Sequence, residues 1–318
     1  MKFINKDIRL LLNDEYESNN LEESFDKFLK LKSGFYFYKK FKDNYTFSSR
    51  IKKLYRQNIV RNMILLDFKK ELEDELKKTN IKYLFYKGIY MLEKFPDLIS
   101  YKRLGDIDLL IDESDLKDFY KLIQKFKLTY IDKEYYFKKY KFYETSIIIK
   151  YKNYKIDLDL HLGFIQKSKF NIDYNQILCN KRIENQIIAL IIQFSNAIFT
   201  ETEKVIDIYY MINNSTIDWD YLIEKINQFR IKKISYIVFQ ILEKELGIRN
   251  LPIEKIKLKK YEIFILNNIF KTNIFRIDQN LLYFYVFDSY FDYLKFLKEK
   301  IIKIKNNGVK EIITSIKG

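Results

Sequence analysis

Cysteine, proline, glycine and histidine are scarce in this chain, and each shortage narrows what the protein can be. Cys179 is the only cysteine, which excludes an internal disulfide and makes a reducing cytoplasm the expected location. The 318 residues include only 7 glycines and 2 prolines, and no Pro/Gly linker, internal repeat or low-complexity stretch is found. No apolar run approaches the roughly 20 residues of a membrane-spanning helix. The N-terminus lacks the apolar core of a signal peptide. We therefore expect a cytoplasmic protein with no membrane span.

Acidic residues are too few to balance the basic ones. Lysine and arginine number 58 against 43 aspartates and glutamates, so the net charge is +15, while 47% of the residues are hydrophobic and can form a real core. Two interpretations stay open: a generally solvated basic surface, or a binding surface for a polyanion such as a nucleoside triphosphate or a nucleic acid. Lysine far outnumbers arginine, which favours the first interpretation.

Hydrophobic periodicity changes twice along the chain. Residues 1–55 are expected to form a helical N-terminal segment. Residues 56–168 alternate between short extended and helical patterns, with a long helix expected at about 56–78 and strands expected at 81–86, 106–111, 142–151 and 154–162. Residues 169–318 are expected to be mostly α-helical, with one of the helices at 202–213. The fold class that this order predicts is α+β, with a small mixed β-sheet in the middle region and helices on either side.

The most informative motif is an Asp-x-Asp pair at the start of a buried strand. Asp106 and Asp108 are two residues apart, so in a strand both carboxylates point to the same side. The apolar run that ends at Ile111 would hold the backbone rigid. Paired oxygen ligands of this kind suit Mg²⁺ or Mn²⁺, which makes both aspartates candidate metal ligands.

Two other short motifs can complete such a site. Lys87-Gly88 follows the expected strand 81–86 and opens a helix, where a glycine and free helix amides can receive a phosphate. Further along, alternation places Asp157, Asp159 and His161 on one face of the strand 154–162. Asp159 is the predicted third metal ligand. His161, the only histidine, is expected to orient Asp159 or to meet the acceptor.

Together these motifs predict a site for two-metal phosphoryl transfer. Asp106 and Asp108 would bridge two ions, and Asp159 would bind the ion that activates the acceptor. Lys87 and Gly88 would hold phosphates, and the pair Lys102-Arg103 could neutralise charge in the transition state, with either residue in that role. Asp207, within a helical apolar pattern, is predicted to pair with a basic residue for structural reasons.

These motifs resemble the signature of the uncharacterised nucleotidyltransferases of the DNA polymerase β-like superfamily. The resemblance rests on Lys87-Gly88, on Gly105 to Ile111 and on Asp159-Leu160-His161, and extends through helical patterns to about residue 252. It implies a nucleotidyltransferase that uses two Mg²⁺ or Mn²⁺ ions, takes a nucleoside triphosphate such as ATP, transfers its nucleoside monophosphate and releases pyrophosphate. The implied metal ligands are Asp106, Asp108 and Asp159, and the residues expected to contact nucleotide or acceptor are Lys87, Gly88, Lys102, Arg103, Gly105 and His161.

The acceptor is the open question. A small molecule of surface-glycan metabolism is the first expectation from the resemblance. A tRNA or protein hydroxyl, as for toxin-type nucleotidyltransferases, is an alternative that the basic charge supports. A non-catalytic basic protein that binds nucleotides or nucleic acid is the third. The preferred base and the oligomeric state do not follow from the sequence.

Overall fold

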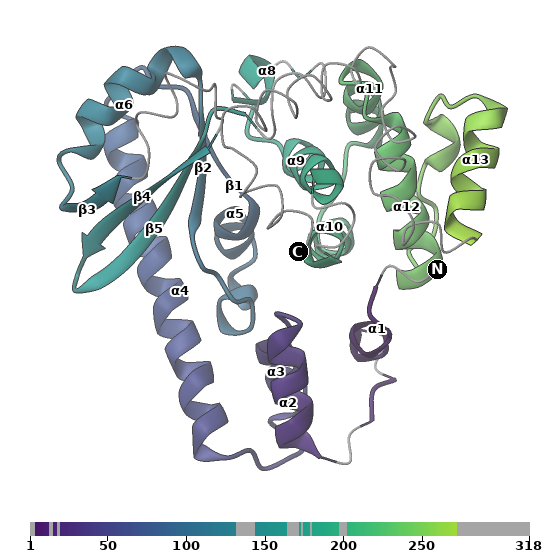
Figure 1. Ribbon diagram of the computed structural model, residues 1–318, viewed down its shortest axis with the longest axis horizontal. Helices are drawn as coiled ribbons and strands as arrows, with labels where there is room; N and C mark the ends of the chain where they lie inside the picture. Colours follow the sequence, from purple (N-terminus) through teal and green to yellow (C-terminus); the bar gives the residue numbers. More distant parts are fainter. Residues whose placement is uncertain are drawn as a thin grey trace, which may run out of the picture.

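A five-stranded mixed β-sheet forms the centre of the computed structural model, which describes residues 4–12, 15–17, 20–131, 144–163, 172, 174–178, 180–196 and 202–271. The strand order is β1-β2-β5-β4-β3 (Figure 1). The strands are β1 (Tyr83–Tyr86), β2 (Ile107–Ile111), β3 (Leu128–Ile131), β4 (Glu144–Tyr151) and β5 (Tyr154–His161). The sheet and the surrounding helices confirm the predicted α+β class.

The central strands β2 and β5 are parallel, whereas every other pair in the sheet is antiparallel. β2 is buried at all five positions, as expected for a strand covered on both faces. In β5 the apolar Ile156, Leu158 and Leu160 are buried on one face. The opposite face carries Asp157, Asp159 and His161, so the predicted alternation is confirmed.

Four helices precede the sheet. They are α1 (Lys6–Leu12), α2 (Leu21–Lys30), α3 (Gly34–Phe41) and the long α4 (Ser49–Leu76). α4 begins earlier than the hydrophobic spacing predicts, because the Ser48 hydroxyl caps it by accepting a hydrogen bond from the Ile51 amide at 3.4 Å. Phe68 of α4 packs edge-on against Tyr151 of β4, which ties the helix to the sheet.

Short helices connect the strands. They are α5 (Lys87–Lys94), η1 (Pro96–Ser100), η2 (Glu113–Asp115) and α6 (Leu116–Ile123). α5 starts directly after β1 and packs against β1, β2 and α9, so it lies between the sheet and the C-terminal helices (Figure 1). The first turn of α5 therefore lies close to the start of β2.

The C-terminal region is helical as predicted. Its elements are α8 (Tyr174–Leu178), α9 (Ile183–Asn196), α10 (Thr202–Asn213), α11 (Trp219–Gln228), α12 (Lys232–Leu246), η3 (Ile253–Lys255) and α13 (Lys260–Lys271). Every residue from Glu184 to Ser195 is buried, which makes α9 the central helix of this region. The Gln186 side chain donates to the Phe85 carbonyl of β1 at 3.1 Å and joins α9 to the sheet. The predicted C-terminal domain beyond residue 271 lies outside the described residues.

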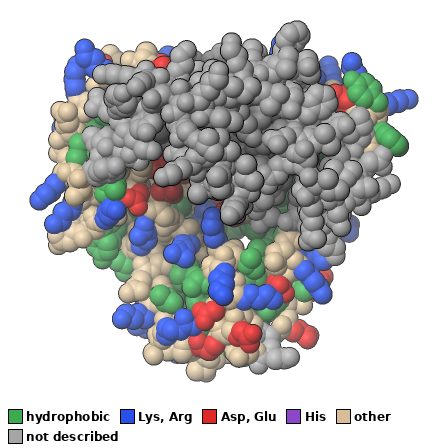
Figure 2. All heavy atoms as spheres, viewed as in Figure 1, with side chains coloured by type: hydrophobic (Ala, Val, Ile, Leu, Met, Phe, Trp, Pro, Cys, Tyr) green, Lys and Arg blue, Asp and Glu red, His purple; other side chains and the backbone are tan. Residues whose placement is uncertain are grey.

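The molecular surface carries many basic side chains. Figure 2 shows lysine and arginine side chains scattered over the described part of the visible face, in keeping with the net charge of +15. Within the described part of the chain, no helix is both long enough and apolar enough to cross a membrane.

Candidate active site

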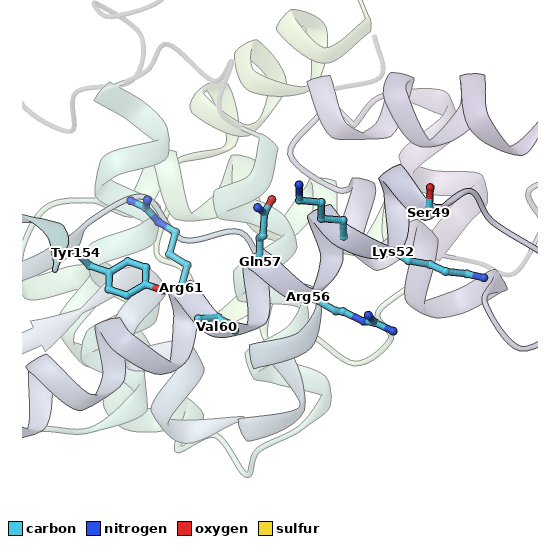
Figure 3. A pocket seen from close by; sticks show the side chains of 8 residues that line it. Ser49, Lys52, Arg56, Gln57, Val60, Arg61 and Tyr154 are labelled. Carbon is cyan, nitrogen blue, oxygen red and sulfur yellow. The ribbon is translucent and has the colours of Figure 1, made fainter. Parts of the chain in front are cut away.

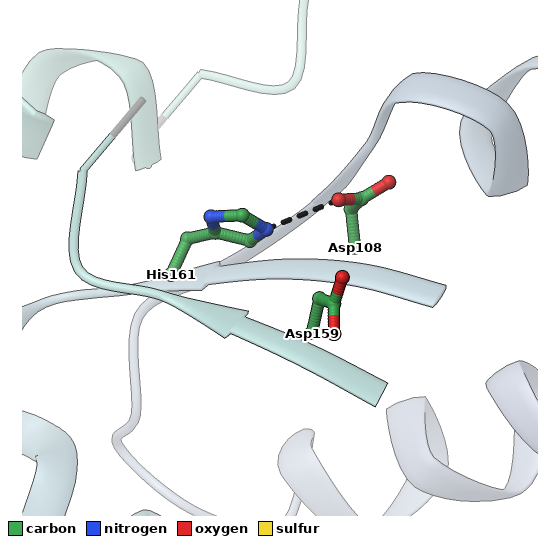
Figure 4. Close-up of side chains that lie close together, drawn as sticks. All are labelled: Asp108, Asp159 and His161. Carbon is green, nitrogen blue, oxygen red and sulfur yellow. Dashed lines mark hydrogen bonds and ion pairs between the residues drawn. The ribbon is translucent and has the colours of Figure 1, made fainter. Parts of the chain in front are cut away.

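Two of the predicted carboxylates are brought together by the parallel pairing of β2 and β5. Asp108 is the register partner of Asp159, so their side chains leave adjacent strands on the same face of the sheet. Ligand atoms of Asp108, Asp159 and His161 all lie within 4.8 Å of one another. Figure 4 shows the three side chains grouped over the ends of the two strands.

Asp108 is the most buried member of this group and has two basic partners. Its Oδ1 accepts a hydrogen bond from Lys87 Nζ at 2.5 Å and lies 3.0 Å from His161 Nε2 (Figure 4). Burial opposes ionisation of Asp108, but the Lys87 charge and the His161 contact outweigh it and hold the pKa of the carboxyl below its usual value. Asp108 is therefore an anion in the folded protein. His161 thus contacts Asp108, and its predicted role in orienting Asp159 stays a prediction.

Lys87 reaches Asp108 from an uncommon backbone conformation. Its φ of 57° lies in the left-handed region, which costs a residue with a Cβ about 1–2 kcal/mol. The conformation occurs where β1 turns into α5. A strained residue that places an ammonium group against a buried carboxylate is typical of a functional site.

Gly88 is required by close packing. A Cβ at this position would lie 2.0 Å from Leu104 Cδ1 and 3.7 Å from Lys102 Cε. The first turn of α5 thus lies directly against the segment that leads into β2. The structure gives Gly88 a packing role, and the predicted approach of a phosphate to its backbone stays a prediction.

Asp106 lies one residue before β2, at the edge of the group. Burial raises the pKa of Asp106, and the negative charge of Asp108 raises it further, while Lys87, Lys204 and His161 act in the opposite direction. Within the described part of the chain its carboxylate has no hydrogen bond or ion pair. A divalent cation near Asp106 would relieve this repulsion. Lys204 comes from α10, far away in the sequence, and no local pattern indicated that its charge acts on Asp106.

The segment before Asp106 is held by polar side chains of α4, which the sequence did not single out. Asn62 Nδ2 donates to the carbonyls of Ile99 at 2.8 Å and Lys102 at 2.7 Å, and Asn58 donates to the Lys102 carbonyl at 3.2 Å. Both asparagines are buried. The sequence did contain a signal for this contact, because the two asparagines lie on the apolar side of the helix. A buried amide must find hydrogen-bond partners, so such residues indicate contact with another segment.

Arg61 continues this set of contacts towards the carboxylates. Its Nε donates to the Leu104 carbonyl at 3.0 Å, and its NH2 group donates to the Gly105 carbonyl at 2.6 Å. The second carbonyl belongs to the peptide that joins Gly105 to Asp106. Gly105 therefore contributes a backbone oxygen to the support of the carboxylate segment, and nothing in the structure places it on a nucleotide.

The two basic candidates before Asp106 have different surroundings. Lys102 Nζ forms an ion pair with Asp207 Oδ1 of α10 at 2.5 Å, and both side chains are largely buried. The predicted structural pairing of Asp207 is thus confirmed, and it connects the sheet region to the C-terminal helices. Arg103 is exposed. Lys102 lies beside Gly88 and the first turn of α5, whereas the side chain of Arg103 faces solvent.

The donor set fits a divalent cation with a preference for oxygen ligands. Asp108 and Asp159 supply carboxylates close together. Asp106 is not among the side chains that lie within 4.8 Å of one another, so its predicted role as a metal ligand stays a prediction. The imidazole of His161 is less suited to Mg²⁺ than to softer metals. Its contact with Oδ1 of Asp108 fits a residue that orients a ligand.

Comparison with protein families agrees with this geometry. The family model described as "Uncharacterised nucleotidyltransferase" matches residues 41–247, which include all five strands and the grouped carboxylates. The chain belongs to this family. No curated protein and no solved structure matches the chain significantly.

Proposed function

We propose that the protein transfers a nucleoside monophosphate from a nucleoside triphosphate to an acceptor hydroxyl and releases pyrophosphate. The supporting observation is the juxtaposition of Asp108 and Asp159 on parallel strands. Asp106, two residues before Asp108, is the proposed third carboxylate. These carboxylates would hold two Mg²⁺ or Mn²⁺ ions. Such ions stabilise the negative charge of the transferring phosphoryl group and lower the pKa of the attacking hydroxyl.

Each neighbouring residue has a role that its contacts support. Lys87, whose ammonium donates to Asp108, would hold the β- and γ-phosphates of a nucleotide bound beside these carboxylates. His161 keeps Asp108 oriented through Oδ1. Lys204 supplies positive charge opposite Asp106. The small glycan-related acceptor expected from the resemblance stays a prediction that no contact in the structure tests, as does the preference for ATP.

Pyrophosphate release tests the proposal. The purified protein is incubated with each of the four nucleoside triphosphates and Mg²⁺ or Mn²⁺, with and without a candidate acceptor. Asp108→Asn and Asp159→Asn should each lower the rate by at least about 100-fold, because each removes a ligand charge from the transition state. Asp118→Asn is the matched control, since Asp118 forms only an exposed pair with Lys121. Equal rates for the three variants would refute the site.

A further inference from the structure

A row of cations occupies the exposed side of the first half of α4. It borders a cavity of about 680 Å³ between α4 and the start of β5 (Figure 3). Half of the eight residues that line this cavity are basic, and none is acidic. We call these four the α4 strip: Lys52, Lys53, Arg56 and Arg61.

The α4 strip is not neutralised by nearby acids. From Ser49 to Leu66 the sequence contains no aspartate or glutamate, and no described carboxylate forms an ion pair with Lys52, Lys53 or Arg56. Further along the chain the pattern is different, because Lys69 in the second half of α4 and Lys77 and Lys78 just after its end all pair with neighbouring acids. Positive charge is thus separated onto the end of α4 that borders the cavity, which favours an anionic ligand there.

The strip ends next to the catalytic carboxylates. Arg61 donates to the Gly105 carbonyl at 2.6 Å, one peptide before Asp106. From Lys52 to Arg61 the helix rises about 14 Å, so a ligand that follows the strip is extended and carries several negative charges. A single phosphate or a nucleoside triphosphate is too short to use the whole strip.

An aromatic ring also lines the cavity. Tyr154, the first residue of β5, is 45% exposed and lines the cavity together with Arg61 (Figure 3). Exposed aromatic rings beside a basic groove are the usual platform for bases of a single-stranded nucleic acid. A sulfated polysaccharide could also pack against such a ring, so competition between the two ligands is part of the test below.

From these observations we propose that the acceptor is the single-stranded end of an RNA, whose phosphates lie along the α4 strip. This rests on the proposed function and names its acceptor class. A ribose hydroxyl oxygen of the RNA would attack the α-phosphorus and form a new P–O bond. The bond from the α-phosphorus to the bridging oxygen would break, pyrophosphate would leave with the electron pair, and the hydroxyl proton would pass to solvent.

The test measures binding of a fluorescent single-stranded RNA of about 12 nucleotides to the full chain, across a range of salt concentrations. Lys52→Glu/Lys53→Glu/Arg56→Glu should weaken binding by at least about tenfold and reduce the salt slope by about 2, since each phosphate contact to a single strand contributes about 0.7. Lys257→Glu/Lys259→Glu/Lys260→Glu is the matched control. It changes the net charge equally at exposed lysines outside the strip, and should bind RNA as the wild type does.

Two further arms identify the ligand. Tyr154→Ala should weaken RNA binding by about tenfold, while Tyr154→Phe should retain it, because the ring alone provides stacking. A sulfated polysaccharide of matched charge should compete only weakly with RNA. Equal competition, equal weakening by the strip and control triples, or no RNA binding by the wild type would overturn the proposal.

The outcomes separate this proposal from the proposed function. Asp108→Asn should bind the RNA normally and fail to label it with a nucleotide. Metal-dependent pyrophosphate release without RNA binding would refute the RNA acceptor and leave nucleotidyl transfer standing. RNA binding through the strip without any transfer in the presence of metal would refute the proposed function.

Discussion

Lys87→Met removes the ammonium that neutralises Asp108 and keeps a side chain of similar length. In the wild type the Lys87 side chain is 17% exposed and that of Asp108 is 6% exposed, so the pair is nearly buried. Breaking a buried pair costs about 3–5 kcal/mol because a charge is left uncompensated. His161 still contacts the same oxygen, which places the expected loss at the lower end, about 3 kcal/mol. Urea denaturation at neutral pH, followed by circular dichroism, measures it.

The loss should depend on pH in a definite direction. The pKa of Asp108 in the folded protein is lowered from 3.8 despite burial, because Lys87 and His161 favour the anion. Asp108 therefore stabilises the fold above about pH 4, and this contribution disappears as the pH falls through the lowered pKa. In Lys87→Met the Lys87 charge no longer counteracts the effect of burial on Asp108, so the pKa of Asp108 should be higher than in the wild type. The difference in free energy of unfolding between the two proteins should be largest near pH 7 and should shrink towards zero in acid.

A control pair and a second comparison sharpen the test. Lys121→Met removes an ion pair in which both side chains are 67% exposed, and should change the free energy of unfolding by less than about 0.5 kcal/mol. Lys87→Gly should be about 0.5–1 kcal/mol more stable than Lys87→Ala, because glycine adopts a φ of 57° without strain. A Lys87→Met protein as stable as the wild type, or a loss that does not change with pH, would refute the assigned role of Lys87.

Three other predictions follow from the contacts around the site. Gly88→Ala should lower the free energy of unfolding by about 1–3 kcal/mol, since the new Cβ would meet Leu104 at 2.0 Å, and Leu104→Ala in the same chain should recover part of it in urea denaturation. Asn62→Leu should cost about 1–3 kcal/mol, because the Ile99 carbonyl loses its donor and the Lys102 carbonyl keeps only Asn58, and should lower kcat more than it changes the KM for the nucleotide. Mg²⁺ at 100 times its Kd should stabilise the wild type by about 2.7 kcal/mol and have little effect on Asp108→Asn, as differential scanning calorimetry can establish.

The sequence predicted those parts of the fold that depend on local periodicity. The bounds predicted for α10, 202–213, agree with the observed helix, and β5 differs from its prediction by one residue. The strand β3 was missed, because this short edge strand has an irregular register with β4 and its four residues give little alternation. The parallel pairing of β2 with β5 does not follow from periodicity, because strand order depends on contacts between segments far apart in the chain.

For the candidate site, too, local sequence patterns were predictive and contacts between distant segments were not. The carboxylates were identified because Asp-x-Asp and an alternating strand are local patterns. The residues around the carboxylates were not predicted. Asn62, Arg61 and Lys204 come from helices whose local sequence does not indicate which segment each side chain will meet. The start of α4 was also placed too late, because its first turns carry the basic residues of the α4 strip and few apolar ones.

The position of the proposed metal ligands on two adjoining strands also affects when in folding the proposed site can form. Asp108 and Asp159 are 51 positions apart in the sequence and meet only when β2 and β5 pair in parallel, a non-local step that is slow in folding. A chain in which the outer hairpin has formed but the central pair has not would contain every ligand and bind metal weakly. Cation affinity can therefore report the completion of folding. Two fragments separated at the turn Lys152-Asn153, which joins β4 to β5, should recover the cation site only after they reassociate.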